Sequence, residues 1–231
     1  MPCIQEFRST LSDNYHRKIQ VSKLSQIQFA RKVANEMGYE LISYLDCGSY
    51  GSAYKITGHR VLKITTDINE VHTVKKILED HNNYNYIAKY YEVKKIESVY
   101  LLTKDVYAII MDYLFVLTDQ KTCCFFDYFL NNFDYSEQFF KENLFDSGVI
   151  QDRVNYYKSN NLRNLLCESN INKYIDNLKK IASDVKRSGI YPVDIHSGNL
   201  GSKYIDDYLV YFDLGANKNY TITSIETINI I

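Results

Sequence analysis

The residues with the clearest chemical pattern lie in the last quarter of the chain, in two short segments. The segment Asp194-Ile-His-Ser-Gly-Asn199 places an aspartate five residues before an asparagine, and a second segment begins at Asp213. Between them, residues 200–205 and 208–212 have the pattern of a β-hairpin. Because a hairpin returns its ends to the same place, Asn199 and Asp213 should lie side by side. Two neighbouring oxygen ligands suit the hard cation Mg²⁺, and Asp194 would stand nearby as a base or a hydroxyl-orienting group.

Each of these residues also has a simpler explanation. Aspartate and asparagine often bracket turns, because their side chains hydrogen-bond to the nearby backbone. A single residue would not outweigh that explanation, but three at these spacings favour a shared site.

A lysine and a glutamate in the first third of the chain form a second pattern. Lys63 stands among apolar residues in a predicted strand, residues 60–65. Without further evidence, the simplest explanation for Lys63 is that its side chain faces solvent. The next segment, residues 68–80, is a predicted amphipathic helix with Glu70 at the edge of its apolar stripe, while Glu79 falls on the opposite side. Glu70 can therefore reach Lys63, although an acid in a first turn also interacts favourably with the helix dipole.

A glycine turn precedes this strand. Gly48-Ser49-Tyr50-Gly51 lies between predicted strands at residues 41–45 and 53–56. Glycine has no Cβ atom, so such a turn lets the backbone approach phosphate oxygens. Most glycine pairs between strands are only turns, and this one is not a Walker A loop, because no Gly-Lys-Ser/Thr sequence follows.

As a set, the N-terminal motifs resemble those of the protein-kinase superfamily, including its aminoglycoside and choline phosphotransferase branch. The glycine turn is similar to the G-x-G-x-x-G-x-V loop, with Asp46 where the first glycine belongs. Lys63 matches the third-strand lysine that pairs ATP phosphates with a helix glutamate, here Glu70. A hydrophobic strand then ends in Met111-Asp112-Tyr113-Leu114, which resembles the gatekeeper and the hinge where the family binds adenine; the resemblance implies nucleotide contacts at Met111, Asp112 and Leu114.

The C-terminal motifs complete the resemblance, in the family's order and over about residues 41–215. Asp194 and Asn199 match the H-R-D-x-x-x-x-N loop, and Asp213-Leu-Gly matches D-F-G. There are two departures. Pro192 replaces the histidine of H-R-D, and His196 replaces the lysine of Ser/Thr kinases, giving the D-x-H-x-G-N form typical of small-molecule kinases.

The resemblance implies an α+β, bilobal, protein-kinase-like fold. We expect an N-terminal extension with a helix over residues 1–40, an N-lobe over 41–114 and a mostly helical C-lobe over 115–231. Only 16 residues follow Gly215 (231 − 215), so the C-lobe should lack an activation segment and the late helices. In that brevity the chain is similar to compact kinase effectors of bacterial pathogens and to small phage kinases.

The implied activity is transfer of the ATP γ-phosphoryl group to a hydroxyl, with Mg²⁺ or Mn²⁺ held by Asn199 and Asp213. We expect a protein Ser/Thr kinase acting on a host or partner protein, with an activating partner left open. A small-molecule phosphotransferase, a nucleotidyltransferase and a pseudokinase binding module are the alternatives. An acidic pocket for a small cationic substrate would have to come from residues 118–170, whose acids read more simply as solvated: Asp127, Asp134, Glu137, Glu142 and Asp146.

Composition limits the other classes. A net charge of −1 gives no basic excess for nucleic-acid binding. No apolar run approaches the length of a membrane span, and the N-terminus lacks the apolar core of a signal peptide. The five cysteines include no C-x-x-C pair, so we expect free thiols and a cytoplasmic chain, with export by a specialised secretion system left open.

Overall fold

The protein is a mixed α+β structure with antiparallel sheets. The computed structural model describes residues 23–48, 50–80, 82–96, 105–131, 152, 155, 168–190, 196–204 and 208–214. Its elements follow the predicted order of strand, glycine turn, strand, strand, helix and further strands. In chain order they are α2 (Lys23–Glu36), β1 (Leu41–Gly48), β2 (Gly51–Ile56), β3 (Arg60–Thr65), α3 (Ile68–Glu79), β4 (Tyr90–Ile96), β5 (Val106–Asp112), β6 (Phe115–Val116), α4 (Gln120–Asn131), α7 (Glu168–Ser188), η2 (Ser197–Asn199), β7 (Leu200–Ser202) and β8 (Leu209–Tyr211).

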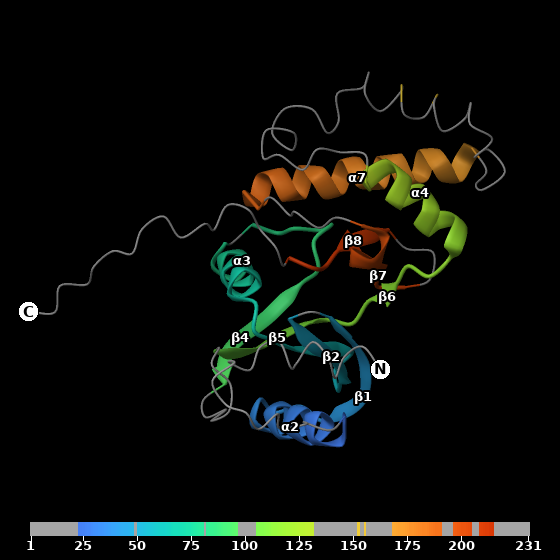
Figure 1. The fold of residues 1–231 in the computed structure, drawn as a ribbon. Coiled ribbons are helices and arrows are strands. Elements are labelled where there is room, and N and C mark those ends of the chain that lie inside the picture. Colours follow the sequence, from blue (N-terminus) through green and yellow to red (C-terminus); the bar gives the residue numbers. More distant parts are fainter. Residues whose placement is uncertain are drawn as a thin grey trace, which may run out of the picture.

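Five strands form the larger sheet, in the order β1-β2-β3-β5-β4 with every neighbouring pair antiparallel. A turn at residues 57–59 joins β2 to β3, and Gly58 adopts a φ of 76° there, which glycine tolerates without steric cost. Helix α2 covers one face of this sheet and α3 lies on the other (Figure 1).

The alternation of side chains along each strand explains why both faces are buried. On β5 every residue is buried: Ala108 and Ile110 pack in the cluster that includes α2, while Ile109 and Met111 pack in the cluster that includes α3 and α7. The same alternation on β3 turns Leu62 and Ile64 toward the α2 side. Val61, Lys63 and Thr65 therefore face the side of α3.

The predicted hairpin at the C-terminal end is present, with shorter strands than expected. β7 pairs with β8, Leu200 opposite Tyr211, and β6 adds a third strand. Helix α7 is amphipathic. Its apolar face is buried except for Tyr174, which is half-buried, and the buried residues are Ile171, Ile175, Leu178, Ile181, Ala182 and Val185.

The two sheets are joined by the segment before β4. Ile87 forms a parallel bridge with Tyr211, the Ala88 N–H donates to the Tyr211 carbonyl (2.8 Å), and the Tyr211 N–H donates to the Tyr86 carbonyl (3.0 Å). The Tyr86 N–H in turn donates to the Asp184 carboxylate on α7 (2.8 Å). These bonds fix β8, and with it the position of Asp213, relative to the larger sheet.

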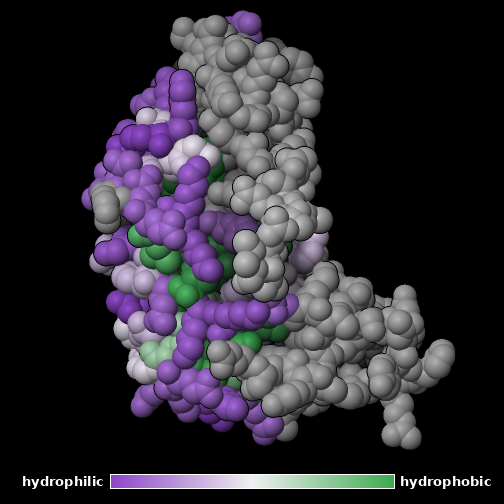
Figure 2. Space-filling model, turned by 90° about the vertical axis from the view of Figure 1, so that its left-hand side faces the viewer, coloured by the Kyte–Doolittle hydropathy of each residue, from purple (hydrophilic) through white to green (hydrophobic). Residues whose placement is uncertain are grey.

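On the side shown in Figure 2, hydrophilic residues cover most of the described surface, and hydrophobic residues are seen in the gaps between them. Within the described ranges, no helix has both the length and the apolar character that crossing a membrane requires.

Candidate active site

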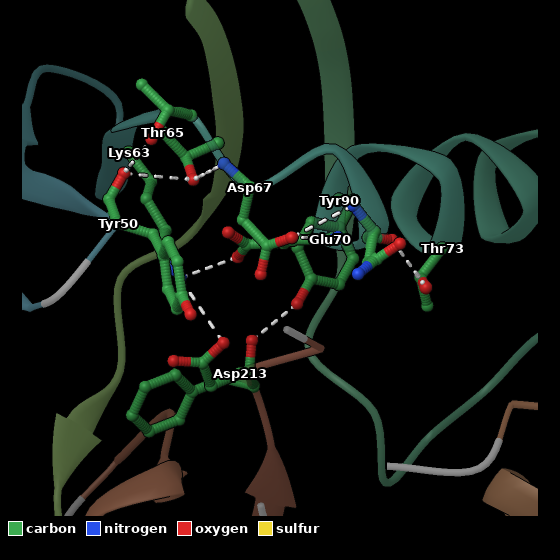
Figure 3. A network of polar contacts seen from close by, with 11 residues as sticks. Tyr50, Lys63, Thr65, Asp67, Glu70, Thr73, Tyr90 and Asp213 are labelled. Atoms are coloured by element: carbon green, nitrogen blue, oxygen red, sulfur yellow. Dashed lines mark hydrogen bonds and ion pairs between the residues drawn. The ribbon is translucent and has the colours of Figure 1, made fainter. Parts of the chain in front are cut away.

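The predicted contact between Lys63 and Glu70 is present, and Asp213 joins it. The Lys63 Nζ lies 2.6 Å from the Glu70 Oε1 and 3.3 Å from the Asp213 Oδ1. Figure 3 shows the three side chains pointing toward one another from β3, α3 and the segment after β8. One ammonium therefore links residues that lie up to 150 positions apart in the sequence.

Local structure explains why these side chains converge. Lys63 faces α3 because of the alternation along β3. Asp67 caps the N-terminus of α3 by accepting hydrogen bonds from the backbone N–H groups of Asn69 (2.9 Å) and Glu70 (3.4 Å). The cap fixes the first turn, in which Glu70 points inward and is only 2% exposed, whereas Glu79 is on the exposed side as predicted.

The charges of this group stabilise one another. Burial by itself would lower the pKa of Lys63, but the Glu70 and Asp213 carboxylates outweigh burial and raise that pKa above its ordinary value. Burial raises the pKa of the Glu70 carboxyl, and the Lys63 ammonium opposes that rise. Lys63 is consequently a fixed cation at neutral pH.

Asn199 and Asp213 both lie at the open end of the hairpin, as the sequence predicted, and both line the same cavity. The backbone N–H of Phe212 donates to the Asn199 carbonyl (3.1 Å), so Asp213 is one residue beyond that contact. Asn199 is 7% exposed, and the Asp213 side chain is 35% exposed. The pair offers one amide oxygen and one carboxylate, both hard oxygen donors of the kind that Mg²⁺ prefers.

The glycine turn lines the same cavity as Lys63, Glu70 and Asp213, but its two glycines differ in their surroundings. A Cβ atom at Gly48 would meet nothing within 4 Å, so that position leaves open space. A Cβ atom at Gly51 would lie 2.1 Å from the Ile64 carbonyl oxygen, so glycine is required there by the packing of β2 on β3. The sequence predicted that Gly51 lets the backbone approach phosphate, but the packing of β2 on β3 is enough to explain why this residue is a glycine. Ser49 lies outside the described residues.

These groups line one cavity of about 500 Å³, within the range of small-ligand sites. Its wall also includes the three residues of the predicted gatekeeper and hinge segment that were expected to contact the nucleotide: Met111, Asp112 and Leu114. The Asp112 carboxylate accepts a hydrogen bond from the Tyr91 hydroxyl (2.6 Å) and pairs with Lys203 across the two sheets (2.7 Å). The backbone around the hinge is held as well, since the Tyr113 N–H donates to the His59 carbonyl (3.1 Å).

The loop before β7 borders the cavity through His196, Gly198 and Asn199. The His196 Nδ1 accepts a hydrogen bond from the Gly198 N–H (3.0 Å), which caps η2. Asp194, the predicted base, lies outside the described residues, as does most of residues 118–170.

Of the five acids named in that stretch, Asp127 is the one among the described residues, and it is less solvated than predicted. Asp127 on α4 was expected to be solvated, but it is half-buried and accepts a hydrogen bond from the Ser197 N–H (2.8 Å). Phe125 and Phe126, which precede it in the sequence, are fully buried. An acid directly after two buried aromatic residues was the sequence signal that could have indicated its partial burial. Tyr90, Tyr91 and Lys203 were also missed, because nothing in their local sequence distinguishes them from other surface or strand residues.

The expectation of free thiols is wrong at Cys47, which lines the cavity and is disulfide-bonded, whereas Cys123 and Cys124 are free. Sequence spacing reveals short-range cysteine pairs but not pairs that the fold brings together. In the described part of the chain, no group of three or more His, Cys, Asp or Glu side chains could hold a metal ion.

Comparison with known proteins assigns no relationship. No protein-family model matches this chain, and no curated protein matches its sequence.

Proposed function

We propose that this chain is an ATP- and Mg²⁺-dependent phosphotransferase with a protein-kinase-like, bilobal fold. The supporting observation is the Lys63–Glu70–Asp213 group on the wall of a cavity that also contains the glycine turn, the hinge and Asn199. Protein kinases use this combination: a third-strand lysine paired with a glutamate of the following helix, and an aspartate and an asparagine that hold metal ions. The five-stranded sheet with α2 and α3 would be the N-lobe, and α4, α7 and the small sheet the C-lobe.

Each residue then has a role in positioning ATP. The Lys63 ammonium, held by Glu70, contacts the phosphates and does not lose its proton at neutral pH. Gly48 leaves room for the phosphates to approach the backbone, and Leu114 and Met111 enclose the base. Asn199 and Asp213 would hold Mg²⁺, which when bound neutralises the charge that develops on the transferred group. Asp194 is proposed to orient the acceptor hydroxyl.

The proposed acceptor is a Ser or Thr hydroxyl of a protein. A small-molecule acceptor is the second candidate, because His196 stands in the loop where Ser/Thr kinases have a lysine, and its Nδ1 is engaged by the Gly198 N–H. Phosphotransfer from γ-labelled ATP into a proteome, beside a panel of aminoglycosides, choline and sugars, separates the two. Stoichiometric labelling of one small molecule with only trace protein labelling would favour the second.

Nucleotide binding is tested first. At a concentration of Mg–ATP about 100 times its Kd, binding adds about 2.7 kcal/mol, which should raise Tm by roughly 5–10 °C. Asp213→Ala should remove most of the Mg²⁺-dependent part of this shift. Asp105→Ala is the matched control, because Asp105 is an exposed acid that pairs with Lys95 outside the cavity. A wild type without a Mg–ATP shift, or an equal shift in Asp213→Ala, would contradict the proposal.

A further inference from the structure

Tyr90 is a buried tyrosine beside the candidate metal ligands. The proposed function gives it no role. It is the first residue of β4, it pairs with Met111 of β5, and it is 4% exposed. Its hydroxyl donates a hydrogen bond to the backbone carbonyl of Phe212 at 2.5 Å. Phe212 directly precedes Asp213, and Figure 3 shows Tyr90 on the side of Asp213 where Glu70 also lies.

The backbone around Phe212 shows what this hydrogen bond contributes. Up to Tyr211 the chain is held by strand pairing with β7 and by the bonds to residues 86–88. The Phe212 N–H donates to the Asn199 carbonyl, which is the last backbone bond of the hairpin. The Phe212 carbonyl lies beyond the strand, and the Tyr90 hydroxyl is its hydrogen-bond partner.

We infer that Tyr90 is a positioning residue that fixes the Phe212–Asp213 peptide, and thereby sets the direction of the Asp213 carboxylate toward the metal position beside Asn199. This inference rests on the proposed function. It deepens that function by adding a member to the site that touches neither ATP nor metal. Groups that orient a metal ligand commonly change metal affinity about 10–100-fold when they are removed.

The surroundings of Tyr90 favour a donating hydroxyl. Burial raises the pKa of Tyr90 well above its ordinary value, and the carboxylates of Glu70 and Asp213 raise it further. The phenol therefore keeps its proton at neutral pH and remains a hydrogen-bond donor. A phenylalanine would preserve the ring in the core and remove only the donor, leaving the Phe212 carbonyl without that hydrogen bond.

The test compares Tyr90→Phe with Tyr107→Phe in the full chain. Tyr107 is a matched control, because it is a buried tyrosine of the same core cluster. No hydrogen bond between described residues joins Tyr107 to Phe212 or Asp213. Binding of Mn²⁺ is measured by electron paramagnetic resonance in the presence of a β,γ-imido ATP analogue. We expect Tyr90→Phe to weaken Mn²⁺ binding about tenfold and to raise the KM for Mg²⁺ similarly, while the metal-free affinity for the analogue stays within about twofold. Tyr107→Phe should resemble wild type.

A second measurement does not depend on activity. Amide hydrogen exchange of the peptide that contains residues 209–214 should increase in Tyr90→Phe and stay unchanged in Tyr107→Phe. Equal exchange in the two variants, or Mn²⁺ binding at the wild-type level in Tyr90→Phe, overturns the inference. If wild type binds no metal–nucleotide, the proposed function fails, and the exchange result alone decides whether Tyr90 fixes the peptide.

If Tyr90→Phe does not fold, the wild-type protein still provides a test. The Tyr90 hydroxyl proton should appear in its NMR spectrum as a slowly exchanging resonance with a cross-peak to the Asp213 amide. Absence of that resonance would contradict the hydrogen bond on which the inference depends.

Discussion

The two glycines of the turn provide a direct test of the structure, because they pair with each other in the β1–β2 register yet differ in their surroundings. In Gly51→Ala, the new Cβ would lie 2.1 Å from the Ile64 carbonyl oxygen and 3.0 Å from the Thr65 Cα. Both are backbone atoms of β3, a strand that is hydrogen-bonded on its two sides. The new Cβ and the Ile64 carbonyl oxygen would have to separate by at least about 1.3 Å to reach an ordinary contact distance.

Overpacking of this kind costs about 1–3 kcal/mol and sometimes more, and here we expect about 3 kcal/mol, because backbone cannot change rotamer. That loss should lower Tm by roughly 6–12 °C. In Gly48→Ala the Cβ meets nothing within 4 Å, so stability should change by no more than about 0.5 kcal/mol.

In nucleotide binding, Gly48→Ala should be the more affected of the two variants. The methyl group of Gly48→Ala would occupy the space through which phosphates approach, so we expect Mg–ATP to bind about tenfold more weakly, a difference of about 1.4 kcal/mol. Thermal unfolding and calorimetric titration measure the two effects on the same samples. Equal thermal stability of the two variants would refute the packing argument, and wild-type affinity in Gly48→Ala would refute the phosphate role of the turn.

Further substitutions test the ion-pair group and the loop before β7. Lys63→Met should destabilise the fold by about 3 kcal/mol by leaving Glu70 buried without its cation, and adding Glu70→Gln should recover part of that loss in chemical denaturation. Because the folded-state pKa of Lys63 is raised, the stability that its charge contributes is fully present below its unfolded pKa and is lost only as the pH rises through the folded value. Lys63 itself therefore gives no fall in the Tm difference between wild type and Lys63→Met over roughly pH 6–9. In the variant, burial raises the pKa of the Glu70 carboxyl without the opposing ammonium, so the difference should grow with pH as that carboxyl loses its proton; a steady decline across that range would contradict the assignment. Asp127→Ala should cost about 1–3 kcal/mol and reduce turnover, while Asp127→Asn, which keeps an acceptor oxygen for the Ser197 N–H, should restore most of both. Equal loss in both Asp127 variants would show that the hydrogen bond is not the cause.

Local patterns were enough to predict most of the secondary structure. The boundaries of α3 and β3 follow from the period of their apolar residues, and a hairpin was expected where β7 and β8 pair. The pairing of Lys63 with Glu70 could also be predicted, because the two lie seven residues apart on consecutive elements whose faces are set by strand alternation and helix periodicity.

The contacts that the sequence did not reveal join distant elements. Tyr90 and Phe212 lie 122 positions apart, and Asp127 and Ser197 lie 70 apart. Neither tyrosine nor aspartate has a local signature for such a contact, since any strand can contain a tyrosine and any helix an aspartate. The disulfide at Cys47 is of the same kind, because bonding depends on which sulfur the fold brings near.

The sequence by itself determined which residues carry charge, which elements form and which face of each element is apolar, because these properties depend on neighbours within a few positions. Only the tertiary structure decided that the Asp213 carboxylate reaches Lys63, that Tyr90 donates to the peptide before it, and that Gly51 is a glycine because of the Ile64 carbonyl. Those outcomes depend on how separate elements pack, and packing is fixed by the fit of whole surfaces rather than by the pattern of any one segment.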